Sequence, residues 1–253
     1  MLPAYRQSLI LERLERQSTV RVSELSREFA VTTETIRRDL EQLHHRGLVS
    51  RTHGGAVATE ALHHDRPYRE RSTQRLDEKR AIARRVMGDI QAGEILGLDS
   101  SSTCSVLADM LPDVALTVVT NSPVIVQSLA SRPNATVIAT GGVLDPQTMA
   151  FTGTIAESTL ARFALDRLFI SCRGIDPVRG VGEASDDHAR LKQSMARSAT
   201  QTYVLADHTK FDRRPAFLGL DWGEVGVLVT DGAAPSEAVK QARNAGAEVW
   251  LAT

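Results

Sequence analysis

One stretch of the sequence decides the fold of the N-terminal part: residues 32–40, which read TTETIRRDL. Thr32 is a typical N-cap residue, and Ile36 and Leu40 lie four positions apart. The stretch therefore predicts a helix over residues 33–46 with one apolar face. The charged and polar residues between these positions fall on the opposite face, which solvent or another molecule would meet.

Short elements surround this helix on both sides. The apolar spacing predicts helices over residues 3–17 and 24–30, with an extended piece at residues 19–22 between them. Residues 48–57 read as two short extended runs around a Gly-Gly pair, which favours a β-hairpin. Three short helices and a hairpin predict a winged helix-turn-helix domain over residues 1–57.

The solvent face of the third helix carries residue types that read DNA. In a helix-turn-helix, the first turns of the second motif helix enter the major groove, where Arg pairs with guanine and Thr reaches bases or phosphates. The hairpin would add contacts to phosphate or to the minor groove. The candidate DNA-binding residues are Thr33, Glu34, Thr35, Arg37, Arg38, Arg51, His53 and Gly54. The alternative is a solvated helix face on which Arg37 or Arg38 pairs with Glu41.

Composition excludes several classes of protein. The 30 Lys and Arg residues balance the 31 Asp and Glu residues, which speaks against a globally basic nucleic-acid coat protein or an acidic disordered tail. Two cysteines are too few for a secreted disulfide scaffold, and we find no apolar run that would span a membrane and no signal-peptide core. These features indicate a cytoplasmic protein. The positive excess lies in residues 1–75, with 13 Arg against 10 acidic residues.

From residue 77 onward, helices alternate with apolar strands. This order predicts an α/β domain over residues 77–253, with a mainly parallel sheet covered on both faces. Residues 58–76 have no apolar period and carry several arginines, so we interpret them as a linker. The expected strands lie at residues 94–99, 116–120, 135–139, 167–170, 202–206, 225–229 and 248–251.

Polar and glycine-containing loops follow several of these strands. Parallel sheets bind ligands at the carboxyl ends of their strands, and N–H groups and hydroxyls at a helix start suit an anion. The candidate ligand-binding residues are Asp99, Ser100, Ser101, Ser102, Thr103, Asn121, Gly141, Gly142, Arg173, Gly174, Asp176, Lys192, Asp207 and Lys210. For each loop residue alone, ordinary capping is the alternative, and for Lys192 it is an exposed surface lysine. Lys210 stands out because the chain has only four lysines.

The N-terminal motifs resemble those of the deoxyribose-operon repressor (DeoR) family of bacterial transcription regulators. Arg6, Ile10 and Leu14 keep the family's four-residue spacing, residues 35–40 match its T-[IVL]-R-R-D-L core, and residues 51–56 resemble its wing. Within this motif, Asp39 is placed to pair with an arginine of its own or a neighbouring helix.

The C-terminal part is similar to the sensor domain of the same family, from Glu78-Lys79 to about Asp231. The pieces that carry this similarity include LDSSST at residues 98–103 and LADHTKF at residues 205–211. The resemblance implies the fold of ribose-5-phosphate isomerase and coenzyme A transferases, and a site for a phosphorylated sugar.

The resemblance as a whole implies a transcriptional repressor of a sugar-catabolic operon. A phosphorylated sugar would release it from operator DNA, without a cofactor, a metal or catalytic residues, and the regulator would act as a homodimer or homotetramer. The chain departs from the family at four positions that are candidate ligand contacts. Ser101 and Ser171 stand where Gly is common, His188 where Glu is common, and Gln193 where Arg is common.

Two other functions compete with this one. The α/β domain would be a sugar-phosphate isomerase-like enzyme if Lys210 and Asp207 served acid–base steps, although the sequence contains no P-loop and no G-x-G-x-x-G, H-E-x-x-H or G-x-S-x-G motif. Alternatively, Cys104 and Cys172 would make the chain a thiol-based redox regulator, although two buried free thiols explain them more simply.

Overall fold

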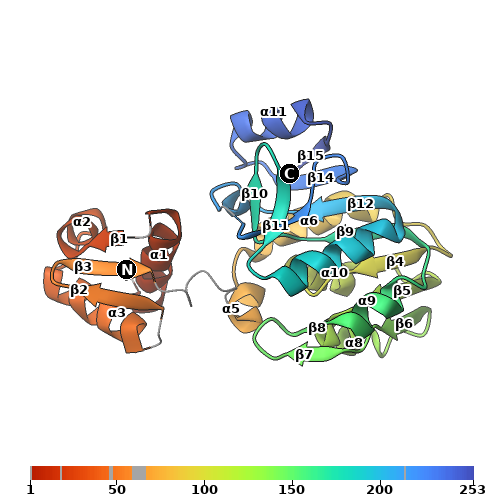
Figure 1. Ribbon diagram of the computed structural model, residues 1–253, viewed down its shortest axis with the longest axis horizontal. Helices are drawn as coiled ribbons and strands as arrows, with labels where there is room; N and C mark the ends of the chain where they lie inside the picture. The colour runs from red at the N-terminus through yellow and green to blue at the C-terminus, as the bar shows by residue number, and fades with distance from the viewer. Residues whose placement is uncertain (1, 18, 46–47, 59–66, 214) are drawn as a thin grey trace. The chain divides into compact units, whose positions relative to one another are not determined.

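The computed structural model describes residues 2–17, 19–45, 48–58, 67–213 and 215–253. The chain divides into two compact units, Met1–Asp65 and Arg66–Thr253 (Figure 1). We call them the winged-helix unit and the α/β unit.

Within its described residues, the winged-helix unit contains the three helices and the hairpin that the sequence predicted, and the extended piece before the second helix joins the hairpin in a three-stranded antiparallel sheet. The helices are α1 (Pro3–Gln17), α2 (Val22–Glu28) and α3 (Thr33–His45), and the strands are β1 (Thr19–Arg21), β2 (Val49–Thr52) and β3 (Gly55–Ala58), in the order β1-β3-β2. Helix α2 begins earlier than expected, because its N-cap is Arg21 and not Ser23. The N–H group of Val22 donates to the carbonyl of Gly54 in the wing, which ties the start of this helix to the hairpin.

A buried ion pair joins the first and third helices of this unit. Arg6 donates from Nε and Nη2 to the two carboxylate oxygens of Asp39, at 2.5 and 3.1 Å, and both side chains are almost fully buried. Gln7 donates to the same carboxylate. The expectation that Asp39 pairs with an arginine of a neighbouring helix is confirmed. The bidentate geometry sets how α1 packs against α3.

The α/β unit is built on a seven-stranded sheet in which every neighbouring pair is parallel. Its order is β15-β14-β12-β9-β4-β5-β6. The bounds are β4 (Ile95–Leu98), β5 (Leu116–Thr120), β6 (Ala135–Ala139), β9 (Leu165–Ile170), β12 (Ala199–Leu205), β14 (Val227–Asp231) and β15 (Glu248–Ala252). Each predicted strand is present, and the mainly parallel sheet is confirmed.

Helices cover both faces of this sheet (Figure 1). Along β9, Leu168 and Ile170 enter one core, while Phe169 between them enters the core on the other face. Helices α9 (Thr154–Leu160), α10 (Asp186–Arg197) and α11 (Ser236–Asn244) pack on the first face, and α6 (Leu76–Met87), α7 (Ser102–Met110) and α8 (Pro123–Leu129) pack on the second. Because both faces are buried, β4 is apolar throughout (ILGL), and β9 and β12 each end in an apolar run (LFI and YVL).

Two small antiparallel sheets were not predicted. One is the hairpin β7 (Val143–Asp145) and β8 (Ala150–Thr152); the other contains β10 (Gly174–Asp176), β11 (Gly180–Glu183) and β13 (Phe217–Leu220). These strands have three or four residues each, and β10 and β11 begin with glycine, so no alternation of polar and apolar residues marks them.

The segment interpreted as a linker over residues 58–76 is partly structured. Ala58 ends β3, and Tyr68–Thr73 form a short helix, α5, which belongs to the α/β unit. Only Tyr68 of this helix is buried, so six residues with one core side chain show no apolar period. Residues 59–66 lie outside the described part of the chain.

Candidate functional sites

The candidate DNA-binding residues lie on two neighbouring elements of the winged-helix unit. Thr33, Glu34, Arg37 and Arg38 are exposed on the first turns of α3, and Arg51, His53 and Gly54 are exposed on the wing. Thr35 is half-buried, and its hydroxyl and N–H group both contact the Thr32 hydroxyl, which caps the helix as predicted.

Acidic neighbours pair with two of the candidate arginines. Arg37 lies 3.5 Å from Glu34, and Arg51 rather than Arg37 or Arg38 contacts Glu41, at 3.4 Å. The side chains of these pairs are 43–73% exposed. Exposed pairs of this kind contribute roughly 0–1 kcal/mol. Phosphates would therefore compete for both arginines at little cost.

The candidate ligand-binding residues gather along one edge of the α/β unit. Most of them follow the carboxyl ends of β12, β9, β4, β5 and β6, which are five consecutive strands of the sheet. Together with Lys192 of α10, these loops form what we call the strand-end site. Asp176 lies apart from the strand ends, in the turn between β10 and β11, where its carboxylate accepts from the N–H groups of Val178 and Arg179.

Lys192 lies at the centre of a buried ion cluster. Its ammonium donates to the carboxylates of Asp99 and Glu183 and to the carbonyl of Ser171, at 3.0, 2.5 and 2.7 Å. Burial alone would lower the pKa of Lys192, but the two carboxylates hold it above its usual range. The second oxygen of Asp99 accepts from the N–H group of Ser101. All three protons of Lys192 are used, so this lysine organises the strand-end loops and is not an exposed surface lysine.

The hydroxyl groups of the loop after β4 have two different roles: one caps a helix, and the others have no partner within the described residues. Ser101 is the N-cap of α7, since its hydroxyl accepts from the N–H group of Cys104 at 3.1 Å. Within the described residues, Ser100, Ser102 and Thr103 make no side-chain hydrogen bond. They leave hydroxyls and the helix N-terminus for a ligand.

Asn121, after β5, has an unmatched acceptor. Its Nδ2 donates to the carbonyl of Phe151 at 3.1 Å, while its Oδ1 is buried and meets no donor among the described residues. A buried polar atom without a partner costs roughly 1–3 kcal/mol. Such an atom is satisfied by a water or by a donor of a ligand.

Two candidate glycines are required for close packing. Gly142 has a φ of +116°, and a Cβ there would lie 2.6 Å from the carbonyl oxygen of Thr152. At Gly174, a Cβ would lie 2.1 Å from the carbonyl oxygen of Arg213. The second contact brings the start of β10 against the chain segment that follows Lys210.

Positive charge accumulates around Lys210, which ends the short 3-10 helix η1 (His208–Lys210). Burial lowers the pKa of Lys210, and the positive charges of Arg213 and Arg173 lower it further, while Asp207 opposes them. Burial would raise the pKa of Asp207, but Lys210 and a hydrogen bond from Thr209 hold it below its usual range. Lys210 thus lies close enough to Arg213, Arg173 and Asp207 to interact with the charge of each.

Lys79 of α6 adds a further cation that the sequence analysis did not assign. Its side chain is 4% exposed, and its ammonium donates to the carbonyls of Arg71 and Gln74 at the end of α5. Burial lowers the pKa of Lys79 to about 8; Asp207 acts against this shift and Lys210 adds to it. Lys79 is thus electrostatically coupled to the Lys210 side of the site.

Both cysteines are buried and free. Burial and the charge of Asp99 raise the pKa of the Cys104 thiol, and burial raises that of Cys172 to about 12. Because the thiolate is the reactive form, neither cysteine is primed for redox chemistry.

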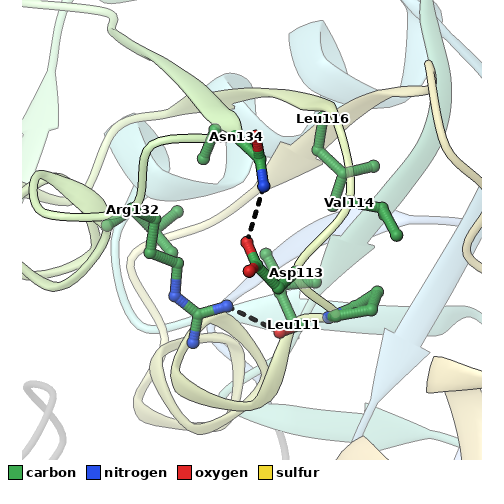
Figure 2. Close-up of a pocket in the computed structure, with 9 residues that line it drawn as sticks. Leu111, Asp113, Val114, Leu116, Arg132 and Asn134 are labelled. Atoms are coloured by element: carbon green, nitrogen blue, oxygen red, sulfur yellow. Dashed lines mark hydrogen bonds between the residues drawn. The ribbon is translucent and has the colours of Figure 1, made fainter.

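Figure 2 shows a small pocket at the opposite end of the sheet, where β5 and β6 begin. Its polar side chains are already paired. Arg132 donates to the carbonyl of Leu111, and Asn134 donates to Asp113. The pocket is separate from the strand-end site, and its hydrogen bonds hold the two loops together.

Three residues of the site were missed at the level of sequence: Glu183, Lys79 and Arg213. Glu183 lies on β11, a strand that the sequence did not reveal, and Arg213 follows a turn with no distinguishing pattern. Lys79 had a signal, because it is one of only four lysines and lies in an apolar helix face beside Ile82. Across the described residues, we find no helix long and apolar enough to cross a membrane and no cluster of metal-ligating side chains.

Comparison with protein families gives two matches that together cover most of the chain. Residues 6–61 match the DeoR-like helix-turn-helix domain, and residues 74–232 match the DeoR C-terminal sensor domain.

Curated relatives match over nearly their full length. The chain is 38% identical to an uncharacterized HTH-type transcriptional regulator, YulB, of Bacillus subtilis (95% of this chain, 93% of the relative). It is 33% identical to the L-fucose operon activator of Haemophilus influenzae (93% and 95%) and to the transcriptional repressor AccR of Agrobacterium fabrum (89% and 88%). Among solved structures, ribose 5-phosphate isomerase A of Methanocaldococcus jannaschii is similar, with a TM-score of 0.40, 13% identity and coverage of 53% and 54%.

Proposed function

Because the chain belongs to the DeoR family of transcriptional regulators, we propose that it represses a sugar-catabolic operon and leaves its operator when a phosphorylated sugar binds the strand-end site. The chain is a DNA-binding regulator and not an enzyme. The sign of regulation and the chemical nature of the effector are the parts we propose.

The grouping of three basic side chains, Lys210, Arg213 and Arg173, is the observation that supports a phosphorylated effector. Lys192 is neutralised by Asp99 and Glu183, so it has no charge to offer a ligand. Lys210, in contrast, is repelled by Arg213 and Arg173. A phosphoryl dianion placed there would relieve this repulsion and accept charge-assisted hydrogen bonds.

The remaining groups of the site suit a polyhydroxylated molecule. The buried Oδ1 of Asn121 needs a donor, which a sugar hydroxyl would supply. Ser102 and Thr103 offer hydroxyls at the start of α7. An effector with a phosphate at the Lys210 side and hydroxyls towards Asn121 would use both kinds of group.

We further propose that the regulator acts on DNA as a homodimer or homotetramer. One winged helix neutralises few phosphates, and each neutralised phosphate adds only modestly to affinity through counterion release. Two copies that read repeated half-sites would add their contacts. Sedimentation of the full chain with and without DNA would test this, and a monomer bound to a single half-site at nanomolar affinity would contradict it.

A two-stage experiment tests the function. First, the full chain selects its preferred sequence from a random duplex library. Second, thermal shift and release of the selected DNA are measured with a panel of phosphorylated sugars, each beside its unphosphorylated form, since a ligand of the folded state raises its apparent stability. We expect at least one phosphorylated sugar both to raise the melting temperature and to release the selected DNA. Its unphosphorylated form should have neither effect. Equal effects of both forms would refute the phosphate site.

Two additional measurements separate this function from its rivals. Transcription in vitro from the selected site distinguishes repression from activation, a distinction that matters because one relative is named an activator. Incubation with pentose phosphates tests for isomerisation, and turnover by the purified chain would contradict the assignment as a regulator.

A further inference from the structure

Helix α5 is the first element of the α/β unit after the boundary with the winged-helix unit at Arg66. It packs on α7, the helix whose N-terminus faces the strand-end site. Helix α5 is therefore the described helix of the α/β unit that lies nearest in sequence to the winged-helix unit.

The loop between β7 and β8 holds the start of α5. The N–H group of Tyr68 donates to the carbonyl of Gln147 at 2.8 Å, and Arg71 donates to the carbonyl of Thr148 at 3.4 Å. The hydroxyl of Thr148 in turn contacts Nε2 of His188, at 3.3 Å. His188 lies one turn before Lys192 on the same helix, α10.

Lys79 holds the end of α5. Its ammonium donates to the carbonyls of Arg71 and Gln74, where the partial negative charge of a helix C-terminus favours a cation. The same ammonium is buried and interacts with the charges of Asp207 and Lys210. One charged group thus belongs to both the attachment of α5 and the ligand site.

We propose that Lys79 is a positioning residue that couples effector binding to the docking of α5. The inference rests on the proposed function, because it takes an anion as the effector. In the empty site, Asp207 attracts the buried Lys79 ammonium and Lys210 repels it. An anion beside Lys210 offsets that repulsion and strengthens the ammonium form, which binds the end of α5. Occupancy therefore tightens α5, and the coupling equals the difference in interaction energy between the two states.

Hydrogen exchange of residues 67–74 in the full chain tests this proposal, with inorganic phosphate as the probe and chloride at equal ionic strength as the reference. We expect phosphate to slow exchange of the α5 amides about tenfold, within the usual range for coupled sites. In Lys79→Met, which keeps the apolar stem and removes the charge, α5 should exchange fast and phosphate should no longer slow it. Lys240→Met, at an exposed position of α11, is the matched control and should behave as the wild type.

A second variant separates the charge of Lys79 from its hydrogen bonds. Lys79→Gln retains a neutral donor for the α5 carbonyls, so we expect slow exchange that no longer depends on phosphate. If phosphate slows α5 equally in wild type, Lys79→Met and Lys79→Gln, the role of Lys79 is refuted.

Thermal shift by phosphate separates a failure of the anion site from a failure of the coupling to α5. If phosphate stabilises the wild type but not Lys210→Met, the anion site stands, and unchanged α5 exchange would then overturn only the coupling. If phosphate stabilises neither protein, the proposed effector site fails and the coupling fails with it.

Discussion

The two sides of the strand-end site hold their lysines in opposite ways. Lys192 is surrounded by Asp99, Glu183 and a backbone carbonyl, and these carboxylates keep its pKa above the usual range. Lys210 lies among Arg213 and Arg173, and burial and those charges lower its pKa. Both lysines were candidate ligand contacts by sequence, with an exposed surface lysine as the alternative for Lys192. Their neighbours distinguish them: two buried carboxylates contact Lys192, whereas Lys210 lies near one buried carboxylate, that of Asp207, and near two arginines.

Replacing Lys192 should have the largest effect on stability. Lys192→Met leaves Asp99 and Glu183 buried without their cation, and breaking such a cluster costs about 3–5 kcal/mol. Urea unfolding at pH 7 measures this loss, with Lys240→Met as the control that should change stability by less than about 0.5 kcal/mol. A loss below about 1 kcal/mol would mean that the two lysines do not differ as described.

Replacing Lys210 should change the affinity for the ligand more than the stability of the fold. Lys210→Met removes the cation that stabilises the buried Asp207 carboxylate, but it also removes the burial cost of Lys210 and its repulsion by Arg213 and Arg173, so the loss of unfolding free energy should be smaller than in Lys192→Met. Affinity for the phosphorylated sugar found in the screen should fall about 10- to 150-fold, the equivalent of one hydrogen bond to a charged group. Calorimetric titration of both proteins gives the ratio. Unchanged affinity would place the phosphate elsewhere in the site.

Lys79 should make the free energy of unfolding depend on pH, and the direction of its pKa shift fixes the sign of this dependence. Its pKa is about 8 in the folded chain, against 10.5 for the ordinary group. Between these values the unfolded chain binds more protons, so stability rises with pH. From pH 7.5 to 9.5, the unfolding free energy of the wild type should gain about 2 kcal/mol relative to that of Lys79→Met.

Denaturant unfolding of the two proteins at both pH values measures this difference. Using a difference between two proteins cancels the titration of all other groups to first order. If the difference in unfolding free energy between the two proteins stays constant across this range, burial does not lower the pKa of Lys79.

The sequence predicted the parts of the site that depend on local pattern. Apolar runs located the strands, and the parallel order then brought Asp99, Asn121 and Asp207 to one edge. What it did not predict depends on contacts distant in sequence. Ser171 and Glu183 meet Lys192 only because α10 returns across β9, and the hairpin that carries Glu183 has no alternating pattern.

The same reason explains why α5 was interpreted as a linker. Its six residues hold one buried side chain, and their attachment comes from Lys79 and from a loop near residue 147. Neither partner is visible in the local sequence. In the winged-helix unit, by contrast, the spacing of Ile10, Ile36 and Leu40 was sufficient, because three short helices leave few ways to bury one apolar face.

The arginines of α3 differ from the buried lysines of the strand-end site because they are exposed. Replacing one of them should have the smallest effect of the changes considered. Arg38 is exposed, so its charge is available without desolvation or rearrangement. If it meets a phosphate, Arg38→Ala should lower affinity for the selected DNA and reduce the slope of log affinity against log salt by about 0.9. Filter binding at several salt concentrations measures this slope, with exposed Arg80→Ala on α6 as the matched control. An unchanged slope with altered sequence preference would instead assign Arg38 to a base, and no change in either would remove it from the DNA-binding surface.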